Sequence, residues 1–340
     1  MALEEKLVQG VRKAQTELSE QDRLLSKAQL AGFYETFRKR FGPDSLSKLD
    51  GEALLQTIHD YSDQDSLVYW LEYKNDDELP AMFGSIAGGS ALKYGIYRRK
   101  ETGIWMMGAP QSQQELSIEQ AIQVARKQRD QLVEGAKLLE RLPANASDAD
   151  YATLQKDMTR AAPDVSDSAW GHKYFSMLYP DKLDDYHNPD YQRFHLIKLL
   201  QIPPQGKGRY VAAGRYVAIA SELEMPLNHL TTILNHKDGN PHRYWRVLAN
   251  FPDTKGLENN WDMMQSGGYV AIPWGDLGDL SDVQHNIESK NRIRSLMETH
   301  YGDKGRWASE IFNFVAVMAE GDLVLAFEGA TVLGIGRVVG

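Results

Sequence analysis

Residues 320–340, EGDLVLAFEGATVLGIGRVVG, contain two runs of alternating apolar residues separated by a Gly-Ala step. Side chains alternate between the two faces of a strand and glycine supplies the positive φ of a short turn, so this stretch predicts a β-hairpin. An isolated hairpin is barely stable in water. The preceding residues must therefore provide a sheet that the hairpin completes.

The residues before the hairpin predict a small half-open β-barrel with helices plugging its mouth. Further strands are expected at 244–251 (YWRVLANF) and 268–274 (GYVAIPW), with an amphipathic helix in IESKNRIRSLMETHY and another in ASEIFNFVAVM. The turn-forming KDGNP at 237–241 separates this region from the rest. We therefore place a C-terminal domain at residues 239–340.

The first segment, residues 1–145, predicts helices, then a small antiparallel sheet, then a long helix. Ser117 followed by Gln120 forms a capping-box pattern at the start of that helix, which is expected to pack on the sheet. Alternating, aromatic-rich runs give the expected strands, at 66–74, 81–87, 91–99 and 104–108.

Residues 146–238 are expected to hold a linker and a small helical domain. The Ala-, Asp- and Ser-rich stretch 142–167 is typical of a linker with one short helix, and helical spacing follows at 190–202, 214–224 and 226–236. The predicted fold class is thus α+β and multidomain, which agrees with a length of 340 residues.

The amino-acid composition excludes several classes of function. The chain is 42% hydrophobic and 25% charged, and no run approaches the roughly 20 apolar residues of a membrane span, so we expect no membrane partner and a cytoplasmic location. There are no cysteines, which excludes disulfides, thiolate zinc sites and thiol nucleophiles. The net charge of −9 provides no global field for nucleic acid, so any such binding must use local patches.

Few motifs point to catalysis. Glu72-x-Lys74 at the end of an expected strand has the spacing of a metal-dependent nuclease, but Asp63 and Asp65 lie too near in sequence to be clear partners, and a solvated strand face explains the pair equally well. The nine histidines include no HxxxH pair with an acidic base, so we expect no metal. There is no G-x-S-x-G elbow for acyl transfer.

The C-terminal domain has more aromatic residues than a small barrel core needs. Rings left over from the core could hold an unstacked nucleobase, where stacking contributes on the order of 1–3 kcal/mol per base. In YVAIPWGDLGDL, Trp274 and Asp276 would supply a stacking surface and a hydrogen-bond acceptor; alternatively Trp274 plugs the barrel and Asp276 caps the next segment. The aromatic residues are Trp245, Trp261, Tyr269, Trp274, Trp307, Phe312, Phe314 and Phe327.

Three stretches carry a family resemblance. YWRVLANF, GGYVAIPWGDLGDL and GDLVLAFEGATVLGIGRVVG together resemble the PUA-like EVE domain that is fused to modification-dependent (type IV) restriction motors of the McrB type. AWGHKYFSMLYPDKLDDYHNPDYQRFHLIKLL looks like the helical segment that precedes the motor in such proteins. Residues 66–108 are similar to an N-terminal module of the same proteins.

The resemblance implies the specificity region of a restriction system, which recognises modified double-stranded DNA by flipping a base into an aromatic pocket. In that family an AAA+ GTPase motor follows and recruits a separate nuclease subunit. No Walker A motif occurs in these 340 residues, so no catalytic residue and no cofactor are expected here. The family's barrels continue with a strand after the GIGRV element, which favours a fragment over a standalone reader.

The resemblance also suggests site residues. Trp274 matches the tryptophan of the family's AI-x-W element, and Asn250, Phe251 and Phe327 lie where related barrels line the pocket mouth. With Asp276, Trp261 and Tyr269 they form the predicted base-binding set. The cations expected to grip phosphates are Arg243, Arg246, Lys290, Arg292, Arg294, Lys304 and Arg306.

Two other functions remain open from the residues alone. One is the nuclease built around Glu72 and Lys74, and the other is a module that binds protein or RNA. The sequence does not distinguish a modified cytosine from a modified adenine, because an aromatic slot accepts any π face.

Overall fold

The protein is described from a computed structural model, in which two compact units comprise residues Met1–Pro241 and His242–Gly340. The description covers residues 3–72, 74, 94–99, 102–108, 112–204, 208–249, 260–284, 286–302 and 305–339. The fold is mixed α+β, as expected. The boundary expected at 145/146 falls inside the first unit, whereas the one expected at 238/239 lies next to the observed division.

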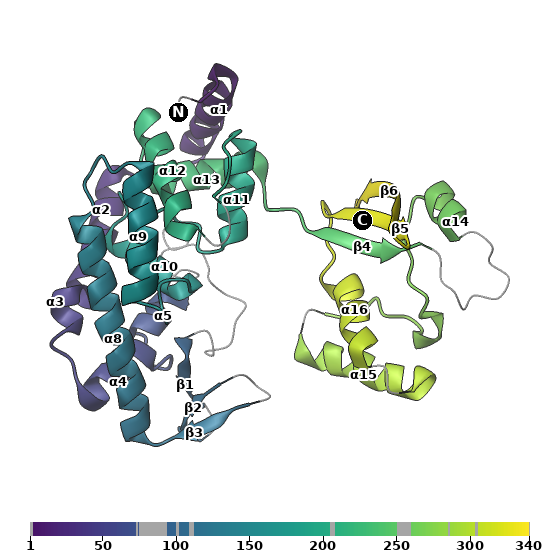
Figure 1. The fold of residues 1–340 in the computed structure, drawn as a ribbon, viewed down its shortest axis with the longest axis horizontal. Coiled ribbons are helices and arrows are strands. Elements are labelled where there is room, and N and C mark those ends of the chain that lie inside the picture. Colours follow the sequence, from purple (N-terminus) through teal and green to yellow (C-terminus); the bar gives the residue numbers. More distant parts are fainter. Residues whose placement is uncertain are drawn as a thin grey trace. The chain divides into compact units, whose positions relative to one another are not determined.

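The N-terminal unit is mostly helical (Figure 1). Capping boxes begin three of its helices, at Ser26 with Gln29, Ser117 with Gln120, and Ser147 with Asp150, so the start predicted at Ser117 is confirmed. Its helices are α1 (Glu5–Glu20), α2 (Lys27–Phe41), α3 (Pro43–Leu46), α4 (Gly51–His59), α5 (Leu67–Glu72), α8 (Ile118–Arg141), α9 (Asp148–Ala161), α10 (Ala169–Leu178), α11 (Pro189–Lys198), α12 (Arg209–Glu222) and α13 (Leu227–Asp238).

A small antiparallel sheet accompanies these helices, in the order β1 (Ile96–Arg98), β2 (Trp105–Met107) and β3 (Gln114–Leu116). Gly103, at φ +69°, supplies the left-handed residue of the β1–β2 hairpin, and the backbone N–H of Arg99 donates to the Ile104 carbonyl. The strands expected at 91–99 and 104–108 are therefore confirmed in their described parts. The strand expected at 81–87 lies outside the described residues.

The strand expected at 66–74 is wrong, because residues 67–72 form helix α5. The Ser66 hydroxyl accepts a hydrogen bond from the Tyr69 backbone N–H, as a helix N-cap does. Leu67, Val68 and Leu71 are all buried, which is the spacing of a helix face rather than of alternating strand residues. Aromatic and branched composition suggested a strand, but packing selected the helix.

The stretch 142–167, expected as a linker with one short helix, does contain one helix, but that helix packs into the core. Helix α9 occupies residues 148–161, and Tyr151, Leu154 and Met158 are buried in the main core of the unit. The Tyr151 hydroxyl donates to the Lys182 carbonyl at 2.9 Å. The acidic and small residues that suggested a linker form the outer face of an amphipathic helix.

The described residues of the N-terminal unit form two hydrophobic cores. The larger joins α2, α4, α8, α9 and α10, and the smaller joins α1 with α11, α12 and α13. The expected helices at 190–202, 214–224 and 226–236 are confirmed as α11, α12 and α13. Long helix α8 touches β2 and β3, but it packs mainly on α4 and α9, so the expectation that it rests on the sheet holds only in part.

The C-terminal unit is built on a three-stranded sheet, β4 (Tyr244–Leu248), β5 (Leu323–Glu328) and β6 (Thr331–Arg337). The β5–β6 hairpin is confirmed, with Gly329 at φ +56° in its turn, and β5 also pairs with β4 in parallel. The other elements are α14 (Asn260–Gly267), the 3₁₀ helix η2 (Gly275–Leu277), α15 (Ile287–Tyr301) and α16 (Gly305–Ala316). Helices α15 and α16 confirm the two helices expected here.

The described residues of this unit form no closed barrel. The segment 268–274, expected as a strand, is irregular: Gly268 has φ +66°, and the Tyr269 backbone N–H donates to the Met264 carbonyl at the end of α14. Both sides of the central strand β5 are occupied by β4 and β6. The hairpin therefore completes an open sheet among the described residues.

The two faces of the sheet have different surroundings. Ala326 is buried with Ala249 and Met264 under α14, while the neighbouring Phe327 lies on a cavity wall. Adjacent strand residues point to opposite faces, so α14 and the cavity lie on opposite faces of β5. Helices α15 and α16 form a separate core around Ile293, Met297 and Ile311.

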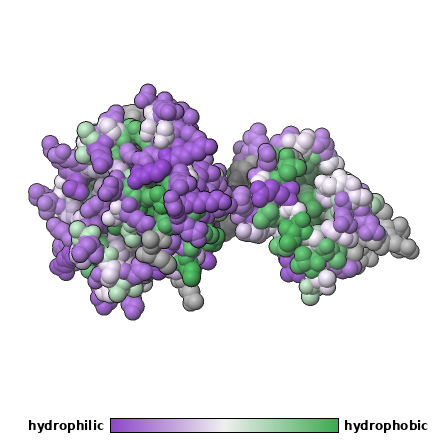
Figure 2. Space-filling view, turned by 90° about the horizontal axis from the view of Figure 1, so that it is seen from above, coloured by the Kyte–Doolittle hydropathy of each residue, from purple (hydrophilic) through white to green (hydrophobic). Residues whose placement is uncertain are grey.

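The surface of the C-terminal unit includes hydrophobic area (Figure 2). Val332 and Ile335 of β6 and the following Val339 are among its exposed apolar side chains. Among the described helices, none has the length and apolarity that crossing a bilayer requires.

Candidate functional site

A cavity of about 1080 Å³ lies in the C-terminal unit, between the sheet and the α15–α16 helix pair. The sheet contributes residues 245–248 and Phe327, and the helical side contributes residues 272–276, Tyr301 and one face of α16. The volume is at the upper end of the range for small-molecule sites. Aromatic side chains line both sides, which is typical of a site for a planar ligand.

Trp274 is central to the helical wall. Its ring centroid is 5.0 Å from that of Tyr301, with an interplanar angle of 84°, and 5.6 Å from that of Trp307, at 46°. The indole packs against the α15–α16 core yet remains partly exposed and lines the cavity. Trp274 is therefore not enclosed as a plug, and it lies just before η2 rather than at a strand end.

Tyr301 fixes the loop that carries Trp274. The backbone N–H of Asp276 donates to the Tyr301 hydroxyl at 3.1 Å. Desolvation raises the pKa of Tyr301, and the nearby Asp276 carboxylate raises it further, so the phenol stays neutral at physiological pH. Asp276 is exposed and lines the cavity, and η2 begins without a side-chain cap.

Arg246 and Phe327 form a stacked pair on the sheet wall. The Arg246 guanidinium carbon lies 3.8 Å from the centroid of the Phe327 ring, and a guanidinium N–H donates to the Gly329 carbonyl at 3.0 Å. On the same strand, the Trp245 indole N–H donates to the Asp322 carboxylate at 2.7 Å, which orients Trp245. The cavity thus has a cation on one wall and an aromatic surface on the other.

Two of the predicted base-binding residues do not line the cavity. Trp261 packs in the α14 core, where its ring lies so close to Gly334 that a Cβ there would be 2.4 Å away. Tyr269 is 50% exposed and its ring lies against Gly267 at the end of α14. Trp274, Asp276 and Phe327 do line it. Asn250 and Phe251 lie outside the described residues.

The predicted phosphate-binding cations are dispersed. The exposed Arg243 donates to the Val317 carbonyl, Lys290 is 5.8 Å from the Phe312 ring centroid, and Arg292 pairs with Asp282 at 2.6 Å. Arg246 lines the cavity and Arg294 is exposed on α15. Lys304 and the side chain of Arg306 lie outside the described residues.

Sequence reasoning placed Trp307 and Phe314 only in the aromatic surplus, and it did not select Tyr301, Glu310 or Asn313 at all. Tyr301 ends α15, and Trp307, Glu310, Asn313 and Phe314 share one face of α16. These four follow the spacing i, i+3, i+6 and i+7, so helical periodicity could have grouped them. It could not have shown that their face meets Trp274.

The nuclease alternative loses its geometric basis. Glu72 belongs to helix α5, is 5% exposed, and is not on a strand face. The Lys74 ammonium lies 5.0 Å from the Trp70 ring centroid. Within the described ranges, no three or more His, Cys, Asp or Glu side chains are grouped to hold a metal ion.

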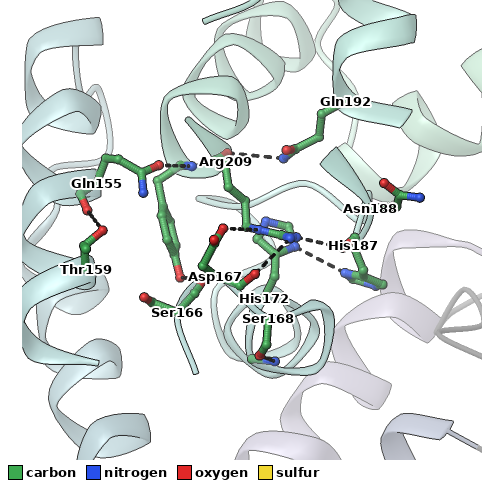
Figure 3. A network of polar contacts seen from close by, with 12 residues as sticks. Gln155, Thr159, Ser166, Asp167, Ser168, His172, His187, Asn188, Gln192 and Arg209 are labelled. Carbon is green, nitrogen blue, oxygen red and sulfur yellow. Dashed lines mark hydrogen bonds and ion pairs between the residues drawn. The ribbon is translucent and has the colours of Figure 1, made fainter. Parts of the chain in front are cut away.

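A second polar cluster lies buried in the N-terminal unit (Figure 3). His172 and His187 are in contact through their Nδ1 atoms at 3.2 Å, and the Arg209 guanidinium donates to the His187 carbonyl at 2.7 Å. Gln192 donates to the Asp184 carboxylate and to the Arg209 carbonyl. Burial lowers the pKa of both histidines, so they are neutral and join α10, α11 and α12 as core residues.

Comparison with known proteins gives one match. Residues 251–340 match a family described as a domain of unknown function, DUF8426. No curated protein and no solved structure matches the chain. The matched region includes the whole helical wall of the cavity and Phe327, but not β4.

Proposed function

We propose that the C-terminal unit is a reader that binds a single modified nucleobase extruded from DNA. The observation that carries this proposal is the cavity of about 1080 Å³ beside a partly exposed Trp274. An enzyme or reader that must inspect one base removes it from the helical stack and holds it against aromatic side chains. Trp274 supplies such a side chain, and it is held by contacts with the rings of Tyr301 and Trp307.

The proposal extends to the whole chain as the DNA-specificity part of a modification-dependent restriction system. Its support is the resemblance of residues 244–251, 267–280 and 321–340 to PUA-like EVE domains. An AAA+ motor and a nuclease subunit are the partners that this resemblance implies. We assign no catalytic role to the chain, and a PUA-like barrel belongs to the proposal only.

The net charge of the C-terminal unit determines how strongly it would attract DNA. Residues 242–340 contain nine Lys and Arg against thirteen Asp and Glu, a net charge of −4. Long-range attraction to DNA is therefore weak, and the affinity would come from the extruded base and from a few local cations such as Arg243, Arg246 and Arg294.

We expect a shallow salt dependence as a result. About three phosphate contacts predict that log K falls with log [salt] at a slope of roughly −3 for duplex DNA. Fluorescence anisotropy over a series of potassium chloride concentrations measures the slope. A slope near −7 would require an extended basic surface and would contradict this account.

Trp274→Ala tests the stacking role. Because the indole is the central ring of the wall, we expect the preference for modified over unmodified duplex to disappear, with about 1–3 kcal/mol of binding lost and the salt-sensitive background binding retained. Binding to duplexes with 5-methylcytosine, N6-methyladenine or no modification measures it.

Tyr269→Ala is the matched control, since it removes an exposed aromatic ring of the same unit that does not line the cavity. This variant should bind as the unaltered protein does. If Trp274→Ala still prefers modified to unmodified duplex, the proposed site is excluded. Stronger binding to RNA than to any DNA would favour the RNA-binding alternative.

A further inference from the structure

The helical wall of the cavity is acidic as well as aromatic. Asp276 and Glu310 are both exposed and line the same cavity as Trp274 and Trp307. Carboxylates only accept hydrogen bonds when ionised, so this wall offers acceptors and negative charge to a ligand. A base edge with carbonyl oxygens would meet repulsion there, whereas a donor or a cation would be attracted.

One positive side chain, Arg246, is among the described residues that line the cavity. Its guanidinium is held on the opposite wall, over Phe327 and against the Gly329 carbonyl. Two carboxylates and one arginine give the described part of the lining a net negative charge, in a unit whose own net charge is −4. The electrostatics therefore favour a positive ligand next to Trp274.

The aromatic surface favours positive charge for a second reason. The face of an aromatic ring attracts cations, and indole does so most strongly. The Trp274 ring meets the Tyr301 ring edge to face, at 84°, and the Trp307 ring at 46°, with centroids 5.0 and 5.6 Å apart, so the three rings contact one another at an angle. A flat cation can stack on only one of these rings, and Trp274, which contacts both of the others, is the ring we assign to that role.

We propose that the cavity selects a cationic nucleobase, one alkylated on a ring nitrogen, over its neutral isomer. This inference rests on the proposed function and names the substrate class of that site. The base would stack on Trp274, with its charge balanced by Asp276 and Glu310. Glu310 is thereby assigned as a specificity residue that sequence reasoning did not select.

Two isomeric bases provide the test. N1-methyladenine is cationic at neutral pH and N6-methyladenine is neutral, and the two differ only in the position of the methyl group and in the one proton that carries the charge. We expect the unaltered protein to bind a short single-stranded DNA with one N1-methyladenine about tenfold more tightly than the same DNA with N6-methyladenine, which equals roughly 1.4 kcal/mol. Isothermal titration calorimetry at constant salt measures both affinities.

Variants that remove one negative charge test whether the carboxylates cause the difference between the two affinities. Asp276→Asn and Glu310→Gln should each lower the ratio of the two affinities by about threefold, because each removes one carboxylate and keeps the side-chain shape. Asp279→Asn is the matched control, since Asp279 lies in the same turn but does not line the cavity, and its Oδ1 accepts from the Ser281 backbone N–H. This control should keep the full ratio.

The outcomes separate the two proposals. If the isomers bind equally, or if both charge variants keep the full ratio, the cationic preference is refuted; a Trp274-dependent preference for 5-methylcytosine DNA would then leave the reader proposal standing. If no modified DNA binds better than unmodified DNA, the reader proposal itself fails. Tighter binding of a trimethyl-lysine peptide than of either oligonucleotide would overturn the nucleobase assignment.

Discussion

Gly171→Ala is expected to destabilise the N-terminal unit by about 3 kcal/mol, at the upper end of overpacking effects. A Cβ at this position in the first turn of α10 would lie 2.0 Å from the Val165 carbonyl oxygen and 3.0 Å from the Ser168 hydroxyl. That carbonyl accepts hydrogen bonds from both the backbone and the hydroxyl of Ser168, whose hydroxyl caps α10. The substitution must therefore displace backbone and weaken the cap.

The same substitution at Gly32 provides the control. Gly32 lies within α2, and a Cβ there would meet no atom within 4 Å. Alanine has the higher helix propensity, so Gly32→Ala should stabilise the protein by about 0.5–1 kcal/mol. Urea unfolding followed by far-ultraviolet circular dichroism measures both variants. Equal effects of the two substitutions would contradict the close approach at Gly171.

Acidification is the second change with a large expected effect. His172 and His187 are fully buried with pKa values well below the usual range, and burial lowers the pKa of His59 to about 3 and that of His195 to about 4. The unfolded chain protonates these side chains below about pH 6.5 while the folded chain does not. Their contribution to stability is complete above pH 6.5 and is lost as the pH falls below it.

The carboxyl groups of buried Asp184 and half-buried Asp185 act in the opposite direction. Burial raises the pKa of Asp184 to about 7 and that of Asp185 to about 6, so the folded state keeps protons that the unfolded state releases above about pH 4. Their effect on stability is therefore most favourable at low pH. Each of the four histidines costs about 2 kcal/mol between pH 7 and pH 5, and the two carboxyl groups together return about 3–4 kcal/mol.

The net expectation is that the free energy of unfolding falls by about 4 kcal/mol from pH 7 to pH 5. Hydrogen exchange of peptides from α10, α11 and α12, read by mass spectrometry, locates the effect in the N-terminal unit. Asp184→Asn removes an opposing group, so it should enlarge this difference by about 2 kcal/mol whatever it does to the absolute stability. Stability that rises from pH 7 to pH 5 would contradict the neutral, buried histidines.

Short-range signals in the sequence determined most of the elements. The capping box at Ser117 and Gln120, the helical spacing in 287–301 and the turn glycine at 329 each depend on neighbours within a few residues, and each led to the observed element. The same local rules failed for α5, where composition suggested a strand, and they did not show that α9, expected as one short helix in a linker, belongs to the core. In both segments burial against distant helices decided the outcome.

The sequence by itself determined that this protein is α+β, that it lacks cysteine chemistry, and that its C-terminal part has a surplus of aromatic residues. Only the tertiary structure decided which of those aromatic residues meet. Trp274 from a loop, Tyr301 from the end of α15 and Phe327 from β5 reach one cavity, while Trp261 and Tyr269 lie elsewhere. Local periodicity fixes which face of an element is apolar, but the partner of that face depends on contacts between residues far apart in the chain.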